Sequence, residues 1–428
     1  MTLPGQRQRA RPAALPGAAV AAIRAQAVQD QQSVTDLIQR LVRVSSQGGV
    51  DPYDPVLDLL AGWLSGRELS PRYLVDDGGA KVGLVCDVAG ARSGPRYVLD
   101  ACVDTAPVGD EGTWRHPPVS GVIEDGWLYG RGAADCKAGA AIFAHVAARL
   151  HQQAAGLHGT LTLLYDADEH TGRFGGAKRY FAGPDRPGDV AGVMIGYPGL
   201  SKVVVGGRGF LRAALTVRGQ AAHSGDGRPT DGGNAVEKAA LLVRALGRYR
   251  TPGAVDPELG LVPKLTVTAI AGGEGYSVIP DRCQVHVDVR LTKRFDAAAG
   301  AGLLQRVVSA IDRRCPAAGS TEIRYEESWP AYQLDESAPV RLALLEAATQ
   351  QLGRSPRAKV VGPSNIGCYL ASLGIDATAG FGVAYRGLHA ADECIELATI
   401  PAVQASYHQA VLRLLSPTAT ADQPAAHS

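Results

Sequence analysis

Four short clusters of acidic, thiol and imidazole side chains stand out as groups that could do chemistry. The densest runs from Tyr165 to Gly172 and places three carboxylates and His170 within five residues, directly after an apolar segment. Acidic side chains gathered in this way repel one another and cost stability unless a cation or hydrogen bonds offset their charge. A metal site is therefore the favoured interpretation of this cluster, and a solvated turn is the alternative.

A second cluster pairs a thiol with a carboxylate in the run Leu99–Pro107. Cys102 and Asp104 are two residues apart, and alternate residues of a strand point the same way, so the two side chains can share one face. The alternative is a core cysteine followed by an aspartate in a turn.

The other two clusters are the run Tyr129–Gly139, which contains Asp135, and the run Gly387–Cys394, which contains His389. Glycines in the first run allow a tight loop to approach a site closely. Asp135 lies where a helix is expected to begin, so it can cap that helix or bind a metal. His389 becomes informative only if the fold returns it to the other clusters.

Strands and helices must position these clusters. The patterns predict strands at residues 81–88, 97–103 and 160–166, and helices at residues 33–44, 55–64 and 138–150. Strands that alternate with helices indicate a layered α/β domain. The clusters follow strand ends, which is where open α/β sheets bind their ligands.

A different pattern fills residues 207–329, with the order βαββαβ that is typical of a split-βαβ sandwich. Its strands are expected at residues 210–217, 264–271, 284–291 and 321–326, and its helices at 234–249 and 298–313. The α/β pattern then resumes, with helices at 339–352 and 400–415 and a strand near 375–380. We therefore expect a domain of residues 33–206 and 330–415 that carries an inserted domain.

The ends of the chain are expected to be flexible tails, residues 1–32 and 416–428. Arginines precede a weakly apolar run near the N-terminus, as in a signal peptide, but Pro16, Gly17 and Arg24 interrupt that run. We therefore favour a tail over a signal peptide. The C-terminal residues are rich in Ala, Thr and Pro, which is typical of disorder.

Composition sets broad bounds. A chain of 428 residues is too long for one compact core, and 46% hydrophobic with 20% charged residues is typical of a soluble globular protein. A net charge of +1 disfavours a nucleic-acid partner, and the sequence has no apolar run of membrane-spanning length. Seven cysteines without a CxxC pair favour reduced thiols in the cytoplasm.

Taken in order, the clusters resemble the M20 family of zinc peptidases and N-acyl amino acid deacylases. The resemblance extends from about residue 35 to residue 415, and its most specific parts are the spans Leu99–Pro107 and Gly126–Gly139. In the second span, Trp127–Gly132 followed by Asp135 and Lys137 is close to the family signature. The run Gly219–Ser224 with the following Asn234 resembles the start of the family's dimerisation or lid domain.

The resemblance implies a zinc-peptidase-like three-layer α/β/α catalytic domain, an inserted α+β dimerisation/lid domain and a two-zinc site. It implies that Asp135 bridges the metals, that the peptide bond after Asp135 is cis, and that Glu169 is the general base on metal-bound water. It also implies that His389 is a metal ligand and that Asp104 orients the first ligand.

Four residues depart from the family pattern: three at the metal site, and Ser277 in the lid, which stands where an asparagine is common. Cys102 replaces a histidine ligand, His170 replaces a glutamate after the base, and Tyr197 replaces a carboxylate before proline. Our hypothesis is one well-bound zinc on Asp135, His170 and His389, with Co²⁺ or Mn²⁺ as substitutes. The second position would have Cys102, Asp135 and Tyr197, and we expect it to be weak or empty because tyrosine is a poor zinc ligand.

These features predict metal-dependent hydrolysis of the amide bond in an N-acyl amino acid or small peptide. By resemblance, His223 of the lid stabilises the oxyanion in the partner subunit, which implies a homodimer. Arg290, with a structural salt bridge as its alternative, and Ser364, Asn365 and Tyr197 are expected to contact substrate. Two other functions stay open: an acyl-transferring or amide-forming enzyme that uses Cys102, and a non-catalytic binding protein.

Overall fold

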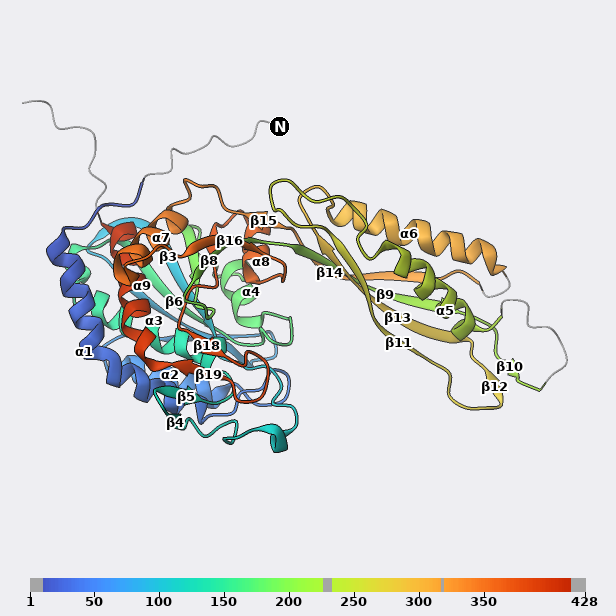
Figure 1. The fold of residues 1–428 in the computed structure, drawn as a ribbon, viewed down its shortest axis with the longest axis horizontal. Helices are drawn as coiled ribbons and strands as arrows, with labels where there is room; N and C mark the ends of the chain where they lie inside the picture. Colours follow the sequence, from blue (N-terminus) through green and yellow to red (C-terminus); the bar gives the residue numbers. More distant parts are fainter. Residues whose placement is uncertain (1–10, 226–232, 317–318, 417–428) are drawn as a thin grey trace, which may run out of the picture. The chain divides into compact units, whose positions relative to one another are not determined.

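The computed structural model describes residues 11–225, 233–316 and 319–416 (Figure 1). The chain divides into two compact units. The first consists of Met1–Val205, Leu334–Lys359 and Ile375–Ser428, and the second of Gly206–Gln333 and Val360–Gly374. An inserted unit is therefore present, as the sequence patterns predicted.

The second unit also takes residues 360–374, which we had expected in the catalytic domain. Hydrogen bonds explain this difference. The Arg208 guanidinium donates to the Gly362 carbonyl at 2.9 Å, and the Ser364 hydroxyl donates to the Arg208 carbonyl at 2.6 Å. The segment is thus tied to the start of the inserted unit rather than to the sheet of the first unit.

The first unit is built on a six-stranded sheet in the order β1-β2-β6-β3-β7-β17. Strands β3, β6, β7 and β17 are parallel, whereas β1 and β2 join antiparallel at one edge. The bounds are β1 (Arg72–Val75), β2 (Lys81–Ala89), β3 (Arg92–Cys102), β6 (His158–Asp166), β7 (Val190–Ile195) and β17 (Ala377–Thr378). Parallel strands end at the same edge, so residues that follow β3, β6 and β7 are brought together.

Helices cover this sheet and complete the three-layer α/β/α arrangement. Helices α1, α3, α7 and α9 pack against one another, and α3, α7 and α9 also contact the parallel strands, whereas α4 contacts β1, β2 and β6 (Figure 1). The bounds are α1 (Gly17–Val42), α2 (Asp54–Ser65), α3 (Ala138–His151), α4 (Gly175–Ala182), α7 (Pro339–Leu352) and α9 (Ile400–Leu415). Alanine makes up five of the ten buried residues of α3, which allows this helix to pack closely.

The expected N-terminal tail is wrong for residues 17–32, which lie in α1. Alanine favours helix, and Ile23 and Ala27 are buried against Ala405 of α9. Asp30 accepts hydrogen bonds from Arg149 of α3, which fixes the same helix on its polar side. Residues 1–10 and 417–428 lie outside the described residues.

The second unit is an antiparallel sheet in the order β11-β13-β9-β14 with two helices packed against it. Strand β13 alternates buried and less buried residues, and its buried valines join the core beneath the helices. The bounds are β9 (Gly209–Arg218), α5 (Ala235–Leu246), β11 (Lys264–Gly272), β13 (Arg282–Leu291), α6 (Ala297–Arg314), β14 (Glu322–Trp329) and α8 (Ile366–Ser372).

Three small sheets complete the described fold. One has the order β18-β19-β5-β4, one β15-β8-β16, and one pairs β10 with β12. The bounds are β4 (Ile123–Glu124), β5 (Trp127–Tyr129), β8 (Lys202–Gly207), β10 (Ala222–His223), β12 (Val278–Ile279), β15 (Tyr332–Gln333), β16 (Arg357–Val361), β18 (Tyr385–Arg386) and β19 (Cys394–Glu396).

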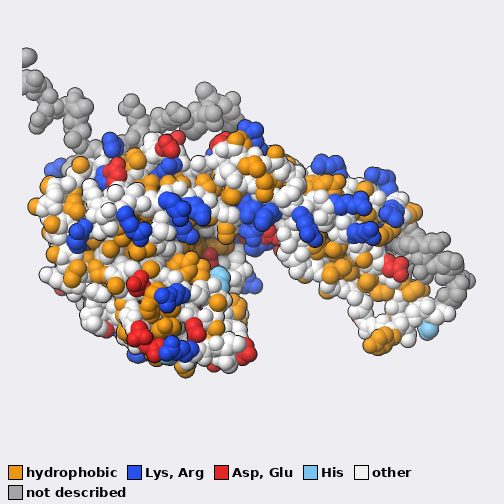
Figure 2. All heavy atoms as spheres, in the orientation of Figure 1, with side chains coloured by type: hydrophobic (Ala, Val, Ile, Leu, Met, Phe, Trp, Pro, Cys, Tyr) orange, Lys and Arg blue, Asp and Glu red, His pale blue; other side chains and the backbone are white. Residues whose placement is uncertain are grey.

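Basic and acidic side chains occur together on the face drawn in Figure 2, with hydrophobic side chains between them. In the part of the chain that the structure describes, no helix is both long and apolar enough to span a bilayer.

Candidate active site and metal centre

The four clusters found in the sequence meet in the first unit. Cys102 is the last residue of β3, Glu169 and His170 follow β6, and Tyr197 follows β7. Asp135 lies in the irregular turn that leads into α3, and the peptide bond from Asp135 to Cys136 is cis, as the resemblance implied. His389, from the loop between β18 and β19, reaches the same place.

The Asp135 carboxylate is the centre of the cluster. Its Oδ2 lies 3.0 Å from His389 Nε2 and 3.5 Å from His170 Nε2. Burial opposes ionisation of Asp135, but the two neighbouring imidazoles outweigh it and hold the Asp135 pKa below its ordinary value. Asp135 is thus an anion whose charge faces two imidazoles.

Asp104 holds the turn that carries Glu169 and His170. Its two carboxylate oxygens accept hydrogen bonds from the backbone N–H groups of these residues, at 3.1 and 2.9 Å. Its Oδ2 also lies 3.5 Å from His170 Nδ1. Gly48 packs beside this turn, because a Cβ at that position would lie 2.9 Å from Asp104 Oδ2. Asp104 therefore orients the His170 ring through Nδ1, while Nε2 of the same ring faces Asp135.

Glu169 is a carboxylate in a largely buried position next to the His170 ring. Its Oε1 accepts a hydrogen bond of 2.7 Å from the Tyr197 hydroxyl. Burial raises the pKa of Glu169 to about 7, although the positive charge of His170 and the Tyr197 hydrogen bond act in the opposite direction. A carboxylate with a pKa in this range is suited to take up and return a proton near neutral pH.

The other two carboxylates of the densest cluster do not face this group. Asp166 lies in β6, where its Oδ1 accepts from the backbone N–H of Ala177, and burial raises its pKa well above the ordinary value. Asp168 accepts a hydrogen bond from the Tyr53 hydroxyl at 3.1 Å. Of the three carboxylates that the sequence singled out, Glu169 alone contacts His170 in the described structure.

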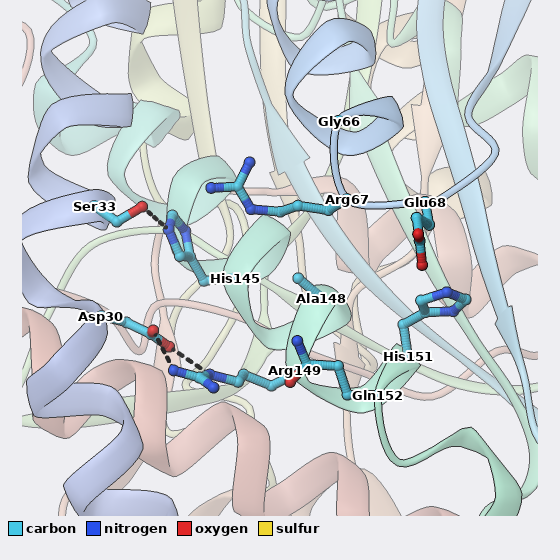
Figure 3. A pocket seen from close by; sticks show the side chains of 10 residues that line it. All are labelled: Asp30, Ser33, Gly66, Arg67, Glu68, His145, Ala148, Arg149, His151 and Gln152. Carbon is cyan, nitrogen blue, oxygen red and sulfur yellow. Dashed lines mark hydrogen bonds and ion pairs between the residues drawn. The ribbon is translucent and has the colours of Figure 1, made fainter.

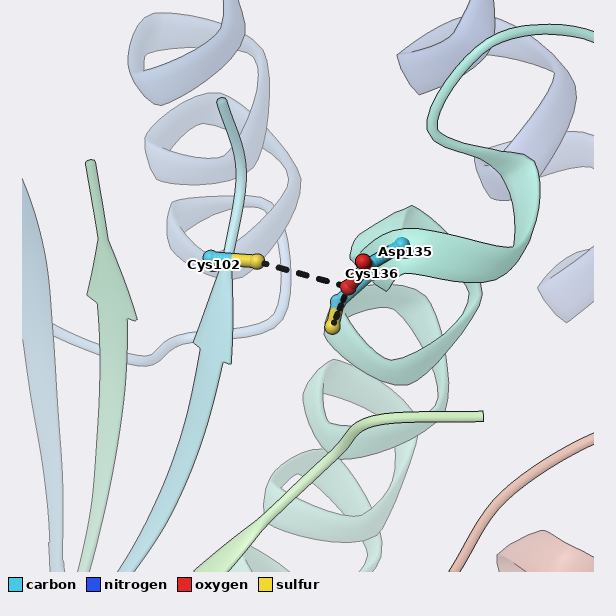
Figure 4. Close-up of side chains that lie close together, drawn as sticks. All are labelled: Cys102, Asp135 and Cys136. Atoms are coloured by element: carbon cyan, nitrogen blue, oxygen red, sulfur yellow. Dashed lines mark hydrogen bonds between the residues drawn. The ribbon is translucent and has the colours of Figure 1, made fainter. Parts of the chain in front are cut away.

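Two thiols also lie next to the Asp135 carboxylate (Figure 4). Asp135 Oδ1 lies 3.0 Å from Cys136 Sγ and 3.9 Å from Cys102 Sγ. Sequence reasoning missed Cys136 as a member of the site. Its position next to Asp135 gave a signal, but only the fold shows that its side chain turns towards the end of β3.

Glu393 is a second residue that sequence reasoning missed. Its Oε1 accepts from the backbone N–H groups of Ala134 and Asp135 at 2.9 and 3.2 Å, and its Oε2 accepts from Arg131 at 2.7 Å. The Glu393 and Arg131 side chains are 1% and 3% exposed. This buried ion pair fixes the backbone that presents Asp135.

The donor atoms suit a transition metal. Asp135, His170 and His389 offer one oxygen and two nitrogens within 4.8 Å of one another, and Cys102, Asp135 and Cys136 form a second such group. Both ring nitrogens of His170 are buried and lack a hydrogen-bond partner, which is costly unless an ion or water satisfies them. A carboxylate with two imidazoles is a ligand set typical of a catalytic zinc.

The remaining predicted residues belong to the second unit. His223 is exposed in β10, and its Nδ1 accepts from the Gly225 N–H. Arg290 forms an ion pair of 2.7 Å with Asp288 and donates to the Ser364 hydroxyl at 3.0 Å, which supports the alternative of a structural salt bridge. Asn365 caps α8 through a hydrogen bond from the Gly367 N–H.

A cavity of about 400 Å³ lies between α1, α3 and the segment Gly66–Glu68, and it contains none of these residues (Figure 3). Two pairs among its polar groups are already engaged, since Arg149 pairs with Asp30 and His145 contacts the Ser33 hydroxyl at 2.9 Å. Burial lowers the pKa of His145 to about 4, so this imidazole is neutral near pH 7.

Comparisons with known proteins show which family and fold the chain resembles. The model of peptidase family M20/M25/M40 matches residues 99–413. A succinyl-diaminopimelate desuccinylase from Marinobacter nauticus is 28% identical over 348 residues, which cover 76% of this chain and 85% of that protein.

Solved structures share the fold at low sequence identity. A tripeptidase from Staphylococcus aureus has a TM-score of 0.69 at 18% identity, covering 89% of this chain and 97% of that one. Human carnosine dipeptidase 1 has a TM-score of 0.69 at 16% identity, covering 94% and 99%. A dinuclear metal-binding M20 peptidase from Bacillus subtilis has a TM-score of 0.64 at 14% identity, covering 92% and 99%.

Proposed function

Because the chain belongs to peptidase family M20/M25/M40, we propose that it hydrolyses the amide bond of a small N-acyl amino acid or peptide, with Glu169 as the general base. As a member of that family, the protein is a metal-dependent hydrolase that acts on amide bonds. One observation carries the finer proposal: the Glu169 carboxylate lies 3.5 Å from His170, beside a buried donor set of Asp135, His170 and His389. The desuccinylase and dipeptidase relatives support this substrate class.

Zinc is the metal we propose for Asp135, His170 and His389, with Co²⁺ or Mn²⁺ as substitutes. A zinc ion in such a site lowers the pKa of water and polarises the substrate carbonyl. The protein supplies the orientation: Asp135 faces both imidazoles through Oδ2, and Asp104 holds His170 from behind.

Glu169 then moves the proton. It takes a proton from the attacking water, since its pKa of about 7 leaves a large fraction ionised at neutral pH. The Tyr197 hydroxyl, at 2.7 Å, holds the carboxylate in one orientation during this step. The protonated Glu169 returns the proton to the leaving amine, which completes the cleavage of the C–N bond.

The second unit supplies further proposed roles. We keep His223 as the donor to the oxyanion in a partner subunit, which makes a homodimer part of the proposal, and its exposed ring in β10 is compatible with that role. Arg290 is proposed to bind a substrate carboxylate, with Ser364 and Asn365 beside it in the same unit.

The test is a panel of N-acyl amino acids and dipeptides, assayed with added Zn²⁺, Co²⁺ or Mn²⁺ against a chelated control. Glu169→Gln should lower turnover about 10²- to 10⁴-fold while metal content and folding stay unchanged. Glu111→Gln, at an exposed glutamate of the same unit, is the matched control and should leave turnover intact. If no substrate is cleaved although metal is bound, the hydrolytic role is refuted and a non-hydrolytic acyl reaction takes its place.

A further inference from the structure

We propose that Cys102 and Cys136, together with Asp135, form a thiolate position for a soft divalent cation such as Zn²⁺ or Cd²⁺. This thiolate position lies beside the imidazole position, which consists of Asp135, His170 and His389, and the two positions share Asp135. The proposal replaces the sequence-based hypothesis of a weak or empty second position, because that hypothesis relied on Tyr197 as the third donor. In the structure the Tyr197 hydroxyl is engaged by Glu169, and Cys136 supplies a thiol instead.

The two oxygens of Asp135 face different donors. Oδ2 faces the nitrogens of His170 and His389, whereas Oδ1 faces the two sulfurs. A carboxylate that presents one oxygen to each of two donor sets has the arrangement of a metal-bridging ligand. Figure 4 shows both sulfurs directed at the carboxylate, from β3 on one side and from the turn before α3 on the other.

The distances suit one ion. Zn–S bonds of about 2.3 Å and Zn–O bonds of about 2.1 Å, at a tetrahedral angle, place sulfur and oxygen about 3.6 Å apart. The observed separations from Asp135 Oδ1 are 3.9 Å for Cys102 and 3.0 Å for Cys136, which lie on either side of that value. All three donor atoms lie within 4.8 Å of one another. Small side-chain rotations are enough to bring them to one centre.

Neighbouring donor atoms, rather than burial alone, separate this thiol pair from ordinary core cysteines. A buried free cysteine usually packs as a small apolar side chain, and Cys86, Cys283, Cys315 and Cys394 are buried as well. Yet in the described ranges Cys102 and Cys136 are the two cysteines that belong to a group of potential metal donors. Cys102 is 4% exposed and Cys136 is fully buried, so the carboxylate that both thiols face lies in an environment with little water.

Binding at this position follows a simple proton balance. One M²⁺ ion enters, the Cys102 and Cys136 thiols each lose a proton to solvent, and two thiolate–metal bonds form. The charge of the ion is neutralised by the two thiolates. Sulfur ligands favour Zn²⁺ and Cd²⁺, whereas Mn²⁺ and Mg²⁺ favour oxygen ligands. The inference rests on the proposed function only in that both positions share Asp135.

Cobalt spectroscopy tests the proposal without an activity measurement. The reduced full-length protein is stripped of metal with a chelator and titrated with Co²⁺, and the near-ultraviolet absorption is recorded, where thiolate-to-cobalt charge transfer appears. We expect an intense band and two equivalents of Co²⁺ per chain. Cys102→Ala and Cys136→Ala should each weaken or abolish the band, and His389→Ala should retain it.

Two further variants keep the test decisive. Cys283→Ala removes a buried thiol from the second unit and should leave the band unchanged. Cys102→His should keep two equivalents of metal while the band weakens, which separates a lost ligand from a lost fold. A wild-type protein that binds cobalt without a thiolate band, or a band that survives both cysteine substitutions, overturns the inference. Turnover that depends on Glu169 in such a protein would leave the proposed function standing.

Discussion

The buried ion pair between Glu393 and Arg131 offers a sharp test of how Asp135 is held in place. The substitution Glu393→Gln keeps the side-chain oxygen that accepts from the backbone N–H groups of Ala134 and Asp135. It removes the negative charge that faces Arg131 at 2.7 Å. The variant therefore isolates the ion pair from the hydrogen bonds to the backbone.

The magnitude follows from burial. The Arg131 side chain is 3% exposed, and its Nε is buried without a hydrogen-bond partner. The lost charge leaves a buried cation uncompensated, which typically costs about 3–5 kcal/mol. We expect about 3 kcal/mol for Glu393→Gln, since the amide still offers Arg131 a neutral acceptor. The double variant Arg131→Met with Glu393→Gln should cost less than Glu393→Gln alone, because no unpaired charge remains.

Urea unfolding followed by tryptophan fluorescence measures the effect. Three of the four tryptophans, Trp63, Trp114 and Trp127, belong to the first unit, so a Trp329→Phe background restricts the signal to that unit. Glu124→Gln is the matched control, since Glu124 pairs with Arg115 at the surface and such pairs contribute about 0–1 kcal/mol. A Glu393→Gln cost no larger than that of Glu124→Gln would refute the reasoning.

Three other predictions concern pH, substrate binding and the N-terminal helix. Burial lowers the pKa of His408 to about 4, so the folded state resists a proton that the unfolded chain accepts below its ordinary pKa of about 6.5. The free energy of unfolding should thus fall by up to about 1.4 kcal/mol per pH unit between pH 6.5 and 4, and it should fall less steeply in His408→Leu. Urea unfolding midpoints measured across this pH range test the prediction, and equal slopes for the two proteins would contradict it. Arg290→Ala should raise KM with little change in kcat if Arg290 binds substrate, whereas an unchanged KM favours a structural ion pair with Asp288. Ile23→Ala should destabilise the first unit by about 2 kcal/mol, measured as above, and a loss near zero would mean that α1 contributes little.

Much of the first unit could be predicted from the sequence, because its strands are short apolar runs and its helices have long apolar faces. The start of α1 could not, since Pro16 and Gly17 interrupt the pattern and few buried side chains hold residues 17–32. Tertiary contacts with α9 stabilise a helix there that local periodicity does not specify. The strands β7 and β8 and the helices α4 and α8 also went unpredicted.

The candidate site was partly predictable for a similar reason. Asp135, Glu169, His170 and His389 stood in conspicuous clusters at expected strand ends. Cys136 and Glu393 stood in the same clusters, but their roles depend on which way their side chains point in irregular backbone, and sequence spacing does not specify this. The Tyr197 contact with Glu169 also joins residues after different strands, so it becomes visible only once β6 and β7 are placed in the sheet.

The order of the donors along the chain has a consequence for biosynthesis. Cys102, Asp135, Cys136 and His170 precede the inserted unit, whereas His389, β17 and α9 follow it. During synthesis, the segment with both cysteines and His170 therefore leaves the ribosome first, and the inserted unit follows. His389 and α9, the helix that packs on α1 and α3, leave the ribosome last. Because domains generally fold as units during synthesis, we expect the inserted unit to fold while the first is still incomplete. Metal that reaches the nascent chain in this interval meets the sulfur donors before it meets His389.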